Sequence, residues 1–534
     1  MRRWNGWGED NEHNPLSAEA RAFLKERVGE ATPNHDVSRE SVLAAITASR
    51  LGDSKLFSMD AATRLDHARG QSYPDWLALR YGKLGPVADG VALPTSSEEA
   101  DAALQAALKM GAVVIPYGGG TSVVGHLHVP QPQVVGDRPV VNISLKKLNR
   151  LRNVDTRNWL ATFDAGTPGP LVESQLKSQG FLLGHFPQSY EYSTVGGWVV
   201  TRSSGQQSLR YGRIEQMLHS ARLSTPRGVV QIGGLPASSA GPDLREALMG
   251  SEGRLGLVTE ATMRIRPIPT HEDFHAVFFP SWEAGIEAAR ALAQADLGLS
   301  MLRLSNEVET ETQLALAGHE KLIIWLRRYL KMRKIGERPV MLLIGTTGNH
   351  RDVLRLKREA LGIAKQHRGV NTGRAIGKGW AKNRFKGPYL RNSLWEAGYG
   401  ADTVETCVSW ANTTQAMRAV EAAAQKVFAS FGERAHCFTH LSHVYRSGCS
   451  VYSTFVFRAG GDYERDLERW KQLKAATSEA IVASGGTISH QHGVGRDHAP
   501  YLVREKGELG LDLIRAMARE FDPQGLMNPG KLFL

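Results

Sequence analysis

Two histidines stand two positions apart in a glycine-rich segment near the end of the chain. Residues 485–495 read Gly-Gly-Thr-Ile-Ser-His-Gln-His-Gly-Val-Gly, which places His490 and His492 among small residues. Glycines let a backbone approach a ligand closely and adopt positive φ, and imidazoles gain or lose protons near neutral pH. The segment predicts an acid–base centre, although a surface loop or an incomplete metal site would have the same composition.

A second glycine-rich loop predicts a site for a diphosphate. Residues 116–126 read Pro-Tyr-Gly-Gly-Gly-Thr-Ser-Val-Val-Gly-His and follow the apolar run 113–115. Consecutive glycines leave backbone N–H groups free to surround an anion. The loop lacks the Gly-x-Gly-x-x-Gly spacing of a dinucleotide fold and the Gly-Lys-Ser/Thr end of a Walker loop.

Two more clusters of small and hydroxyl-bearing residues follow in the same region. Residues 187–205 concentrate serines, threonines and glycines, which can hydrogen-bond a ribityl chain and a diphosphate. Residues 250–260 read Gly-Ser-Glu-Gly-Arg-Leu-Gly-Leu-Val-Thr-Glu and can present backbone groups to a flat heterocycle. Each cluster alone could be a structural turn, but three in one region favour a shared role in binding a cofactor.

In this order, the three segments resemble the FAD-binding domain (PCMH type) of the vanillyl-alcohol-oxidase-type flavoproteins. The resemblance covers most of residues 85–270. It implies non-covalent FAD, because Thr121 stands where members with covalent flavin often carry histidine, with nearby His126 as the alternative point of attachment. The cofactor contacts that it implies are Pro116, Gly118, Gly119, Gly120, Thr121, Ser122, Gln188, Ser189, Ser193, Thr194, Gly197, Thr201, Ser203, Ser204, Glu252, Gly253, Leu255, Gly256 and Val258.

Within this family the chain resembles, nearly end to end, the alkyldihydroxyacetonephosphate synthases of ether-lipid synthesis. The matching motifs include an N-terminal Arg-Trp-Asn-Gly-Trp-Gly at residues 3–8. The resemblance implies an alkylglycerone-phosphate synthase, a transferase that exchanges the acyl group of acyl-dihydroxyacetone phosphate for a long-chain fatty alcohol through an adduct at flavin N5. It implies proton transfer by Tyr452, His490 and His492, and binding of phosphate or carboxylate by Arg303 and Arg391.

The middle residue of the histidine segment departs from that pattern. The synthases carry Ser-His-His-His-Gly where residues 489–493 read Ser-His-Gln-His-Gly. Glutamine hydrogen-bonds but does not move a proton at neutral pH. Either His490 or Tyr452 therefore takes that role, or the reaction differs.

Two alternative functions stay open at this point. One is an FAD-dependent 2-hydroxy-acid dehydrogenase or oxidase of the D-lactate or glycolate type, whose C-terminal pattern resembles residues 522–531. Some of these enzymes bind a divalent metal, but residues 439–445 supply histidines without the matching carboxylate, so no metal is predicted. The other is a flavin-binding protein without catalysis that acts as a scaffold at a lipid surface.

Short β-rich runs separated by helical stretches and turns predict a scaffold of the α+β class for these segments. The length of 534 residues exceeds one ordinary core, so more than one domain is expected. Residues 1–84 are expected to form a helical extension, 85–269 a two-subdomain FAD-binding domain, 270–484 a cap domain with an antiparallel sheet covered by helices, and 485–534 a segment that packs back on the FAD domain. Helices are predicted over 16–28, 37–51, 97–109, 169–179, 282–296, 351–366, 416–431, 463–483 and 510–521. Strands are predicted over 87–93, 113–116, 140–143, 160–165, 229–232, 257–265, 273–279 and 340–345.

The composition constrains partners and location. A net charge of +11 suits an anionic partner, but no nucleic-acid-binding motif is present. The sequence shows neither a secretory signal nor an apolar run of membrane-spanning length, and three cysteines form no disulfide or zinc pattern, so a cytoplasmic protein is expected.

Residues 321–334 combine apolar and aromatic side chains with six cations, which predicts a peripheral membrane contact. A core-facing helix with a solvated basic side is the alternative. The family resemblance also implies a homodimer.

Overall fold

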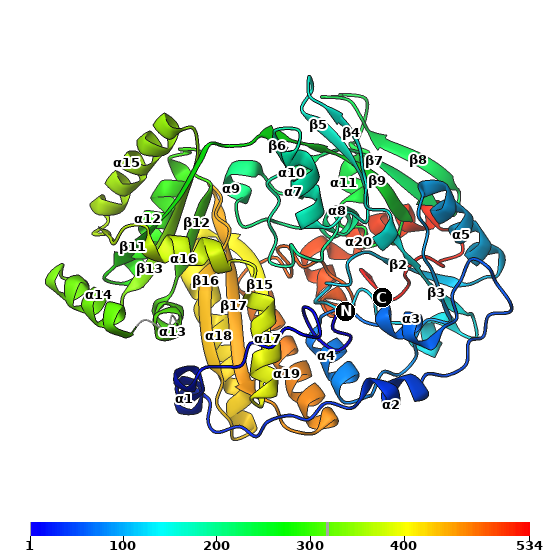
Figure 1. The fold of residues 1–534 in the computed structure, drawn as a ribbon, viewed down its shortest axis with the longest axis horizontal. Helices are drawn as coiled ribbons and strands as arrows, with labels where there is room; N and C mark the ends of the chain where they lie inside the picture. Colours follow the sequence, from blue (N-terminus) through cyan, green and yellow to red (C-terminus); the bar gives the residue numbers. More distant parts are fainter. Residues whose placement is uncertain (1, 317–319, 534) are drawn as a thin grey trace.

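The computed structural model describes residues 2–316 and 320–533 and has the predicted α+β architecture. A cofactor-type domain with two larger sheets and one two-stranded sheet lies beside a domain built on one large sheet (Figure 1). Among the described residues, no helix combines the length and apolar character needed to cross a membrane.

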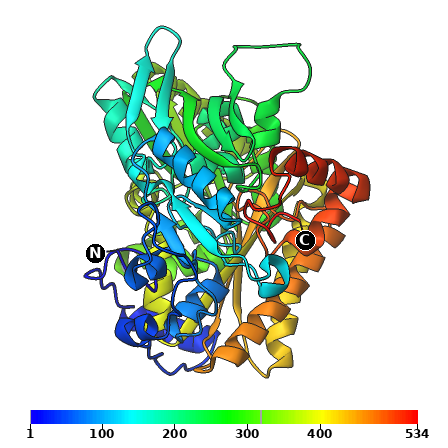
Figure 2. The same ribbon diagram turned by 90° about the vertical axis from the view of Figure 1, so that its right-hand side faces the viewer.

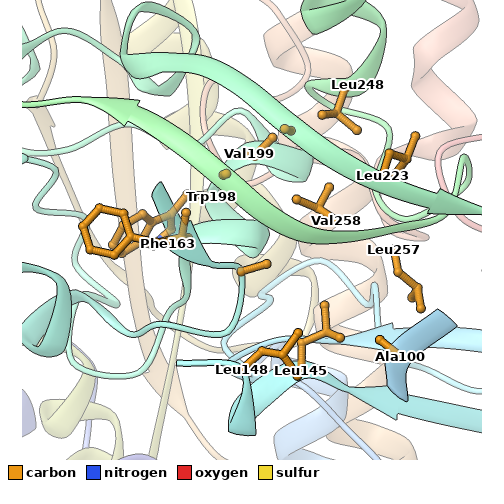
Figure 3. Close-up of a cluster of buried hydrophobic side chains, with 14 of the residues drawn as sticks. Ala100, Leu145, Leu148, Phe163, Trp198, Val199, Leu223, Leu248, Leu257 and Val258 are labelled. Carbon is orange, nitrogen blue, oxygen red and sulfur yellow. The ribbon is translucent and has the colours of Figure 1, made fainter. Parts of the chain in front are cut away.

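The first domain holds its two larger sheets around one helix. A parallel sheet has the order β1-β3-β2 and an antiparallel sheet has the order β4-β5-β9-β7-β8. Helix α5 (Ser97–Lys109) contacts strands of both sheets, and its Ala100 lies next to Leu257 in the core (Figure 3). The strands are β1 (Gly90–Ala92), β2 (Val113–Tyr117), β3 (Val140–Ser144), β4 (Leu151–Asp155), β5 (Leu160–Asp164), β7 (Leu218–Thr225), β8 (Gly228–Gly233) and β9 (Leu257–Arg264).

The cap domain has a seven-stranded antiparallel sheet with helices on both faces. Alternate residues of the central strand that contains residues 341–344 point to opposite faces of the sheet. Leu342 and Ile344 belong to one apolar cluster, whereas Met341 and Leu343 belong to another. In sheet order the strands are β14 (Val370–Asn371), β11 (His271–Phe279), β13 (Val340–Gly348), β12 (Met301–Ser305), β16 (His436–Leu441), β17 (Gly448–Arg458) and β15 (Tyr399–Ser409).

Helices of the cap fall into two groups. The first cluster takes side chains from α12 (Trp282–Gln294), α15 (His350–Gln366) and α18 (Thr413–Ser430). The second takes them from α13 (Glu307–Leu316), α14 (Glu320–Met332) and α16 (Ala375–Asn383). Further elements are α6 (Pro132–Val135), α7 (Gly169–Lys177), β6 (Phe181–Leu182), α8 (Val195–Thr201), α9 (Ser208–Tyr211), α10 (Ile214–Met217), α11 (Leu244–Leu248), β10 (Arg266–Pro267) and α17 (Gly387–Glu396).

The N-terminal region is more deeply packed than its polar sequence indicates. It contains α1 (Ala18–Arg27), α2 (Arg39–Ala44), α3 (Ala61–Asp66) and α4 (Tyr73–Arg80). All eight residues of α4 are buried, and the helix contacts α19 (Tyr463–Ala483) of the cap. The helix predicted over 37–51 was wrong beyond Ala44, because the Arg50 backbone N–H and guanidinium instead donate to Asp89.

The C-terminal region returns to the first domain. After α19 the chain crosses between the domains and enters α20 (Leu502–Phe521), which is kinked at Gly507. The last residues then run beside β2, where Val114 N–H donates to Leu526 O at 2.8 Å. Figure 2 shows this C-terminal segment lying against the cofactor-type domain. The crossing segment carries both histidines of residues 485–495 to the boundary between the domains.

Candidate active site

A first cavity of about 1040 Å³, counted with its open mouth, lies where the glycine-rich loops meet the crossing segment. Sixteen of the nineteen predicted cofactor contacts line it: Pro116, Gly118, Gly119, Gly120, Thr121, Ser122, Ser189, Ser193, Thr194, Gly197, Thr201, Ser203, Glu252, Gly253, Gly256 and Val258. The fold therefore brings three segments that are far apart in sequence to one concave wall.

The wall suits the diphosphate and ribityl parts of FAD. A side chain at Gly119 would collide with the Tyr192 carbonyl oxygen, so only glycine lets the loop follow this path. The Thr194 hydroxyl lines the cavity and is buried, with no hydrogen-bond partner among the described residues. A buried hydroxyl without a partner is costly, and a cofactor oxygen would satisfy it.

Three predicted contacts lie elsewhere. Gln188 is exposed beside Gly387, Ser204 Oγ lies 3.3 Å from His443 Nδ1, and Leu255 belongs to the core of the first domain. Asn528 lines the cavity and was missed. Its Asn-Pro-Gly-Lys context was noted in the sequence, but only as a feature of the hydroxy-acid enzymes.

His126 lines the same cavity, and both of its ring nitrogens lie close to polar groups of the protein. Its Nδ1 lies 2.7 Å from Ser122 Oγ, and its Nε2 lies 3.0 Å from Glu252 Oε2. Glu252 also accepts hydrogen bonds from the backbone N–H groups of Val494 and Gly495. This carboxylate therefore joins two glycine-rich loops to the histidine segment.

The two histidines of that segment face different cavities. His492 and Gln491 line the first cavity. His490 lines a second cavity of about 1460 Å³ with its mouth, between the first domain and α20. Apolar residues in its lining include Met249, Ile488, Leu502, Ile514, Met517 and Leu532. The path of the crossing segment thus separates two residues that the sequence placed in one centre.

Both ring nitrogens of His490 have partners. Its Nδ1 lies 3.1 Å from Glu405 Oε1, and its Nε2 lies 2.7 Å from both Arg213 Nη1 and the Tyr445 hydroxyl. A guanidinium only donates, so Nε2 accepts, and the ring proton on Nδ1 points to Glu405. The geometry describes a neutral imidazole that is held rather than free to exchange protons with a ligand.

Glu405 is the centre of this network and was missed by the sequence analysis. It accepts hydrogen bonds from Gln491 Nε2 at 2.6 Å and Ser442 Oγ at 2.9 Å, and His492 Nε2 lies 3.9 Å away. Burial works to raise the pKa of Glu405, but its interactions with His490 and the neighbouring histidines hold the pKa well below the ordinary value. The available signal was a carboxylate in the middle of the β-rich run 399–409, although Asp402 lies in the same run.

Sheet register explains why Tyr452 joins this group. Tyr452 on β17 pairs with Glu405 on β15 and with His440 on β16, so the three side chains share one face. The Tyr452 ring meets the His492 ring edge-on at 6.0 Å, and its hydroxyl donates to Thr403 Oγ1 at 3.2 Å. Burial raises the pKa of Tyr452 to about 12, so the hydroxyl stays protonated.

Arg391 on α17 lies near this group with one nitrogen unused. Its Nη1 donates to Gln71 O at 2.7 Å, and its guanidinium lies 4.2 Å from the Trp76 ring centroid. Nη2 is buried and has no hydrogen-bond partner in the described parts of the chain. Burial lowers the pKa of Arg391, while the nearby Asp402 carboxylate opposes this effect. A free buried guanidinium nitrogen suits an anionic ligand.

Arg303 lies in neither cavity. Its Nη2 lies 2.6 Å from Glu309 Oε1, Glu309 Oε2 lies 3.0 Å from His440 Nδ1, and the His440 ring stacks on Tyr452 at 4.9 Å. Burial would raise the pKa of Glu309, but Arg303 and His440 lower it to about 2. The structure therefore connects Arg303 to Tyr452 only through a chain of contacts.

Glu405, His443 and His490 have donor atoms within 4.8 Å of one another, a spacing compatible with a metal ion. The chemistry of the group does not favour a cation, because Arg213 already donates to His490 Nε2. His443 Nδ1 contacts Ser208 Oγ at 3.1 Å. These histidines are occupied as hydrogen-bonding groups.

Comparisons with known proteins agree with this architecture. Residues 88–233 match the FAD binding domain family, and residues 268–532 match the C-terminal domain of FAD linked oxidases. An alkyldihydroxyacetonephosphate synthase of Trypanosoma brucei brucei is 33% identical over 89% of this chain and 78% of its own length. A solved alkyldihydroxyacetonephosphate synthase structure superposes with a TM-score of 0.83 at 27% identity, covering 99% of this chain and 98% of its own.

A mitochondrial cytochrome-type D-lactate dehydrogenase of Arabidopsis thaliana is less similar, at 25% identity over 84% of this chain and 73% of its own length. Identity above 30% over most of both proteins, together with the shared fold and FAD-type cavity, decides the family. The chain belongs to the alkyldihydroxyacetonephosphate synthase family of FAD-dependent enzymes.

Proposed function

We propose that this enzyme exchanges the acyl group of acyl-dihydroxyacetone phosphate for a long-chain fatty alcohol. The observation that supports this most directly is the unpartnered Arg391 Nη2, buried near Tyr452, whose ring contacts His492 on the wall of the FAD-type cavity. An anion-binding group, a hydrogen-bond donor and a proton acceptor are thereby assembled beside one cofactor site. The exchange breaks the C1–oxygen bond to the acyl group and forms a C1–oxygen bond to the alcohol.

Three side chains would have separate roles in binding the phosphate, accepting a proton and stabilising the leaving group. Arg391 would hold the phosphate through Nη2. His492 would accept a proton through its ring, since burial lowers its pKa and keeps the imidazole neutral near pH 7, although Glu405 opposes this effect. Tyr452 would stabilise the departing carboxylate by a hydrogen bond from its protonated hydroxyl. When bound, FAD supplies an electrophilic ring system for this chemistry without net oxidation or reduction.

Gln491 fits this arrangement as a positioning group. Its amide Nε2 donates to Glu405 in a place where a histidine N–H would also donate. The glutamine therefore preserves the hydrogen bond of the family's middle histidine without its proton. Proton transfer is left to His492, and Tyr452 serves as a hydrogen-bond donor.

Non-covalent attachment of FAD is part of the same proposal. Thr121 offers no nucleophilic ring nitrogen, and both nitrogens of His126 lie within 3.0 Å of Ser122 or Glu252. Acid denaturation should release all yellow colour into the supernatant. Colour that remains with the precipitated protein, and is lost in His126→Ala, would contradict non-covalent binding.

The decisive experiment supplies acyl-dihydroxyacetone phosphate and hexadecanol to the FAD-loaded protein without oxygen. We expect an alkyl ether of dihydroxyacetone phosphate and free fatty acid, with the same flavin absorbance before and after turnover. Bleaching of the flavin by D-lactate or glycolate, without ether formation, would instead support the hypothesis that the protein is a 2-hydroxy-acid dehydrogenase or oxidase.

Contact with a membrane surface through α14 is a further part of the proposal. Ile323, Leu326 and Leu330 pack against the cap sheet, whereas Trp325 and Met332 are 67% and 78% exposed. Exposed apolar side chains among cations suit the boundary of an anionic bilayer. We also expect a homodimer, which sedimentation analysis would test.

Liposome sedimentation tests the membrane contact without removing a helix that covers the core. Replacing Leu322, Trp325 and Met332 by serine should reduce binding to anionic vesicles. The matched control replaces Leu509 and Leu513, which are equally exposed on α20, by serine. Equal binding by both variants would contradict the role of α14.

A further inference from the structure

The first residues of the chain form a buried hook that the proposed function leaves without a role. Residues 2–8, here called the N-terminal hook, turn back on themselves, with the Arg3 backbone N–H donating to Gly8 O at 2.8 Å. Asn5, Gly6, Trp7 and Gly8 are all buried. Figure 1 shows the hook between the cap sheet and the first domain, beside α4 and α17.

One side of the hook lies on the cofactor loops. Arg2 Nη1 donates to Gly119 O at 2.6 Å, inside the run of three glycines. The Arg2 guanidinium lies 4.5 Å from the centroid of the Tyr192 ring, and the Trp7 ring meets that same ring edge-on at 5.2 Å. The hook is therefore fastened to two of the segments that form the first cavity.

The other side of the hook is fastened to α17. The Trp7 backbone N–H donates to Asn392 Oδ1 at 3.3 Å, and Asn392 Nδ2 donates to Trp7 O at 2.6 Å. The fit is close, because a Cβ added to Gly6 would lie 2.5 Å from Asn392 Oδ1. Asn392 directly follows Arg391 in the chain, so the hook holds the backbone next to the proposed phosphate ligand.

A second connection runs through Gln71. Its Nε2 donates to Gly6 O at 3.3 Å, and its Oε1 accepts from Trp76 Nε1 at 2.7 Å. The Gln71 carbonyl oxygen accepts from Arg391 Nη1, and the Trp76 ring lies beneath the guanidinium. Both contacts that orient Arg391 thus depend on a residue that the hook holds.

We propose that the N-terminal hook is a positioning element that directs Arg391 Nη2 toward the phosphate of the substrate. The hook also bonds to the glycine-rich loop at Gly119. It would thereby hold this loop and Arg391, the two anion-binding parts of the site, at a fixed distance from each other. This inference rests on the proposed function, which assigns the phosphate to Arg391. The hook residues themselves touch neither phosphate nor reacting atoms in this scheme.

The test uses Asn392→Ala in the FAD-loaded full chain, with dihydroxyacetone phosphate as the probe in calorimetry. We expect binding about tenfold weaker and a similar rise in KM for the acyl substrate, with kcat changed much less. The matched control is Asn34→Ala, which removes one hydrogen bond to Trp395 O at the far end of α17 and should bind the probe normally.

A double-mutant cycle separates positioning from general stability. In an Arg391→Ala background, Asn392→Ala should not weaken probe binding further, because the guanidinium that the hook would orient is no longer present. Gly6→Ala provides a second variant, which disturbs the same contact from the side of the hook, because its added Cβ would collide with Asn392 Oδ1. Normal probe binding in both Asn392→Ala and Gly6→Ala, or an undiminished loss in the Arg391→Ala background, would overturn the inference. Probe binding that depends on the hook without any ether formation would contradict the proposed function and support the hook.

Discussion

The two walls of the active site are built in different ways. The wall from the first domain consists of backbone and small side chains from three continuous loops, with Gly119 and Thr194 as examples. The wall on the cap side is carried by His492 and backed by single side chains from separate strands, such as Glu405 and Tyr452, which contact His492 and are joined by sheet register. The first wall is suited to hold a cofactor, and the second to position protons. Changes on the two walls should therefore have separable effects on FAD binding and turnover.

The strongest expected separation comes from Glu405→Gln. The amide cannot serve as an ionised acceptor for His490, Gln491 and Ser442 together, so the histidine segment loses its common partner. We expect kcat to fall on the order of a hundredfold or more with FAD content unchanged, measured by ether formation and flavin absorbance. Glu421→Gln is the control, because burial raises the pKa of this second cap carboxylate and an amide resembles its protonated form. Loss of FAD in Glu405→Gln would remove the distinction between the walls.

His492→Asn should lower kcat by about a hundredfold and change its pH dependence. His492 acts as a neutral base, so wild-type activity should fall as pH drops through its pKa, which lies below 6.5. This acidic limb should disappear in the variant. His490→Asn serves as the comparison and should keep the limb while lowering thermal stability. A retained limb in His492→Asn would assign the base to another group.

Glu309→Gln tests whether the contacts of Glu309 with Arg303 and His440 stabilise the cap domain. The folded pKa of about 2 lies below the ordinary 4.5, so ionised Glu309 stabilises the fold above about pH 4.5 and loses this effect as pH falls toward 2. The variant should unfold about 3 kcal/mol more easily at pH 7, with the difference from wild type shrinking below pH 4.5. Urea unfolding across pH measures this; a difference that does not vary with pH would argue against the ion pair.

The smallest effect should come from Thr194→Val on the cofactor wall. Loss of one hydrogen bond of about 1 kcal/mol should weaken FAD binding about fivefold while leaving kcat at saturating FAD unchanged. Gln188→Ala provides the comparison, because this predicted contact lies outside the cavity. Titration of the apoprotein with FAD measures both. Equal weakening by the two variants would show that FAD does not bind specifically at the cavity wall that contains Thr194.

The same difference between the walls explains what the sequence could predict. Cofactor loops are continuous segments whose glycines and hydroxyls signal their role directly, so most of the wall was identified, and the α+β class was confirmed. The cap wall depends on which residues face each other across β15, β16 and β17, and a single sequence does not contain that register. Glu405 was missed for this reason. The placement of His490 and His492 at different cavities depends on partners such as Arg213, which lies 277 positions from His490 in the chain.

The pairing of the C-terminal residues with β2 has a consequence for how the enzyme is made. Residue Val114, beside the glycine-rich loop, hydrogen-bonds to Leu526 and Asn528, and Glu252 is bonded to Val494 and Gly495. A nascent chain that has emerged only through its first domain lacks these partners. The cofactor pocket is therefore completed only after residues 494–528 have been synthesised, so FAD is expected to be captured after these residues have folded back onto the first domain.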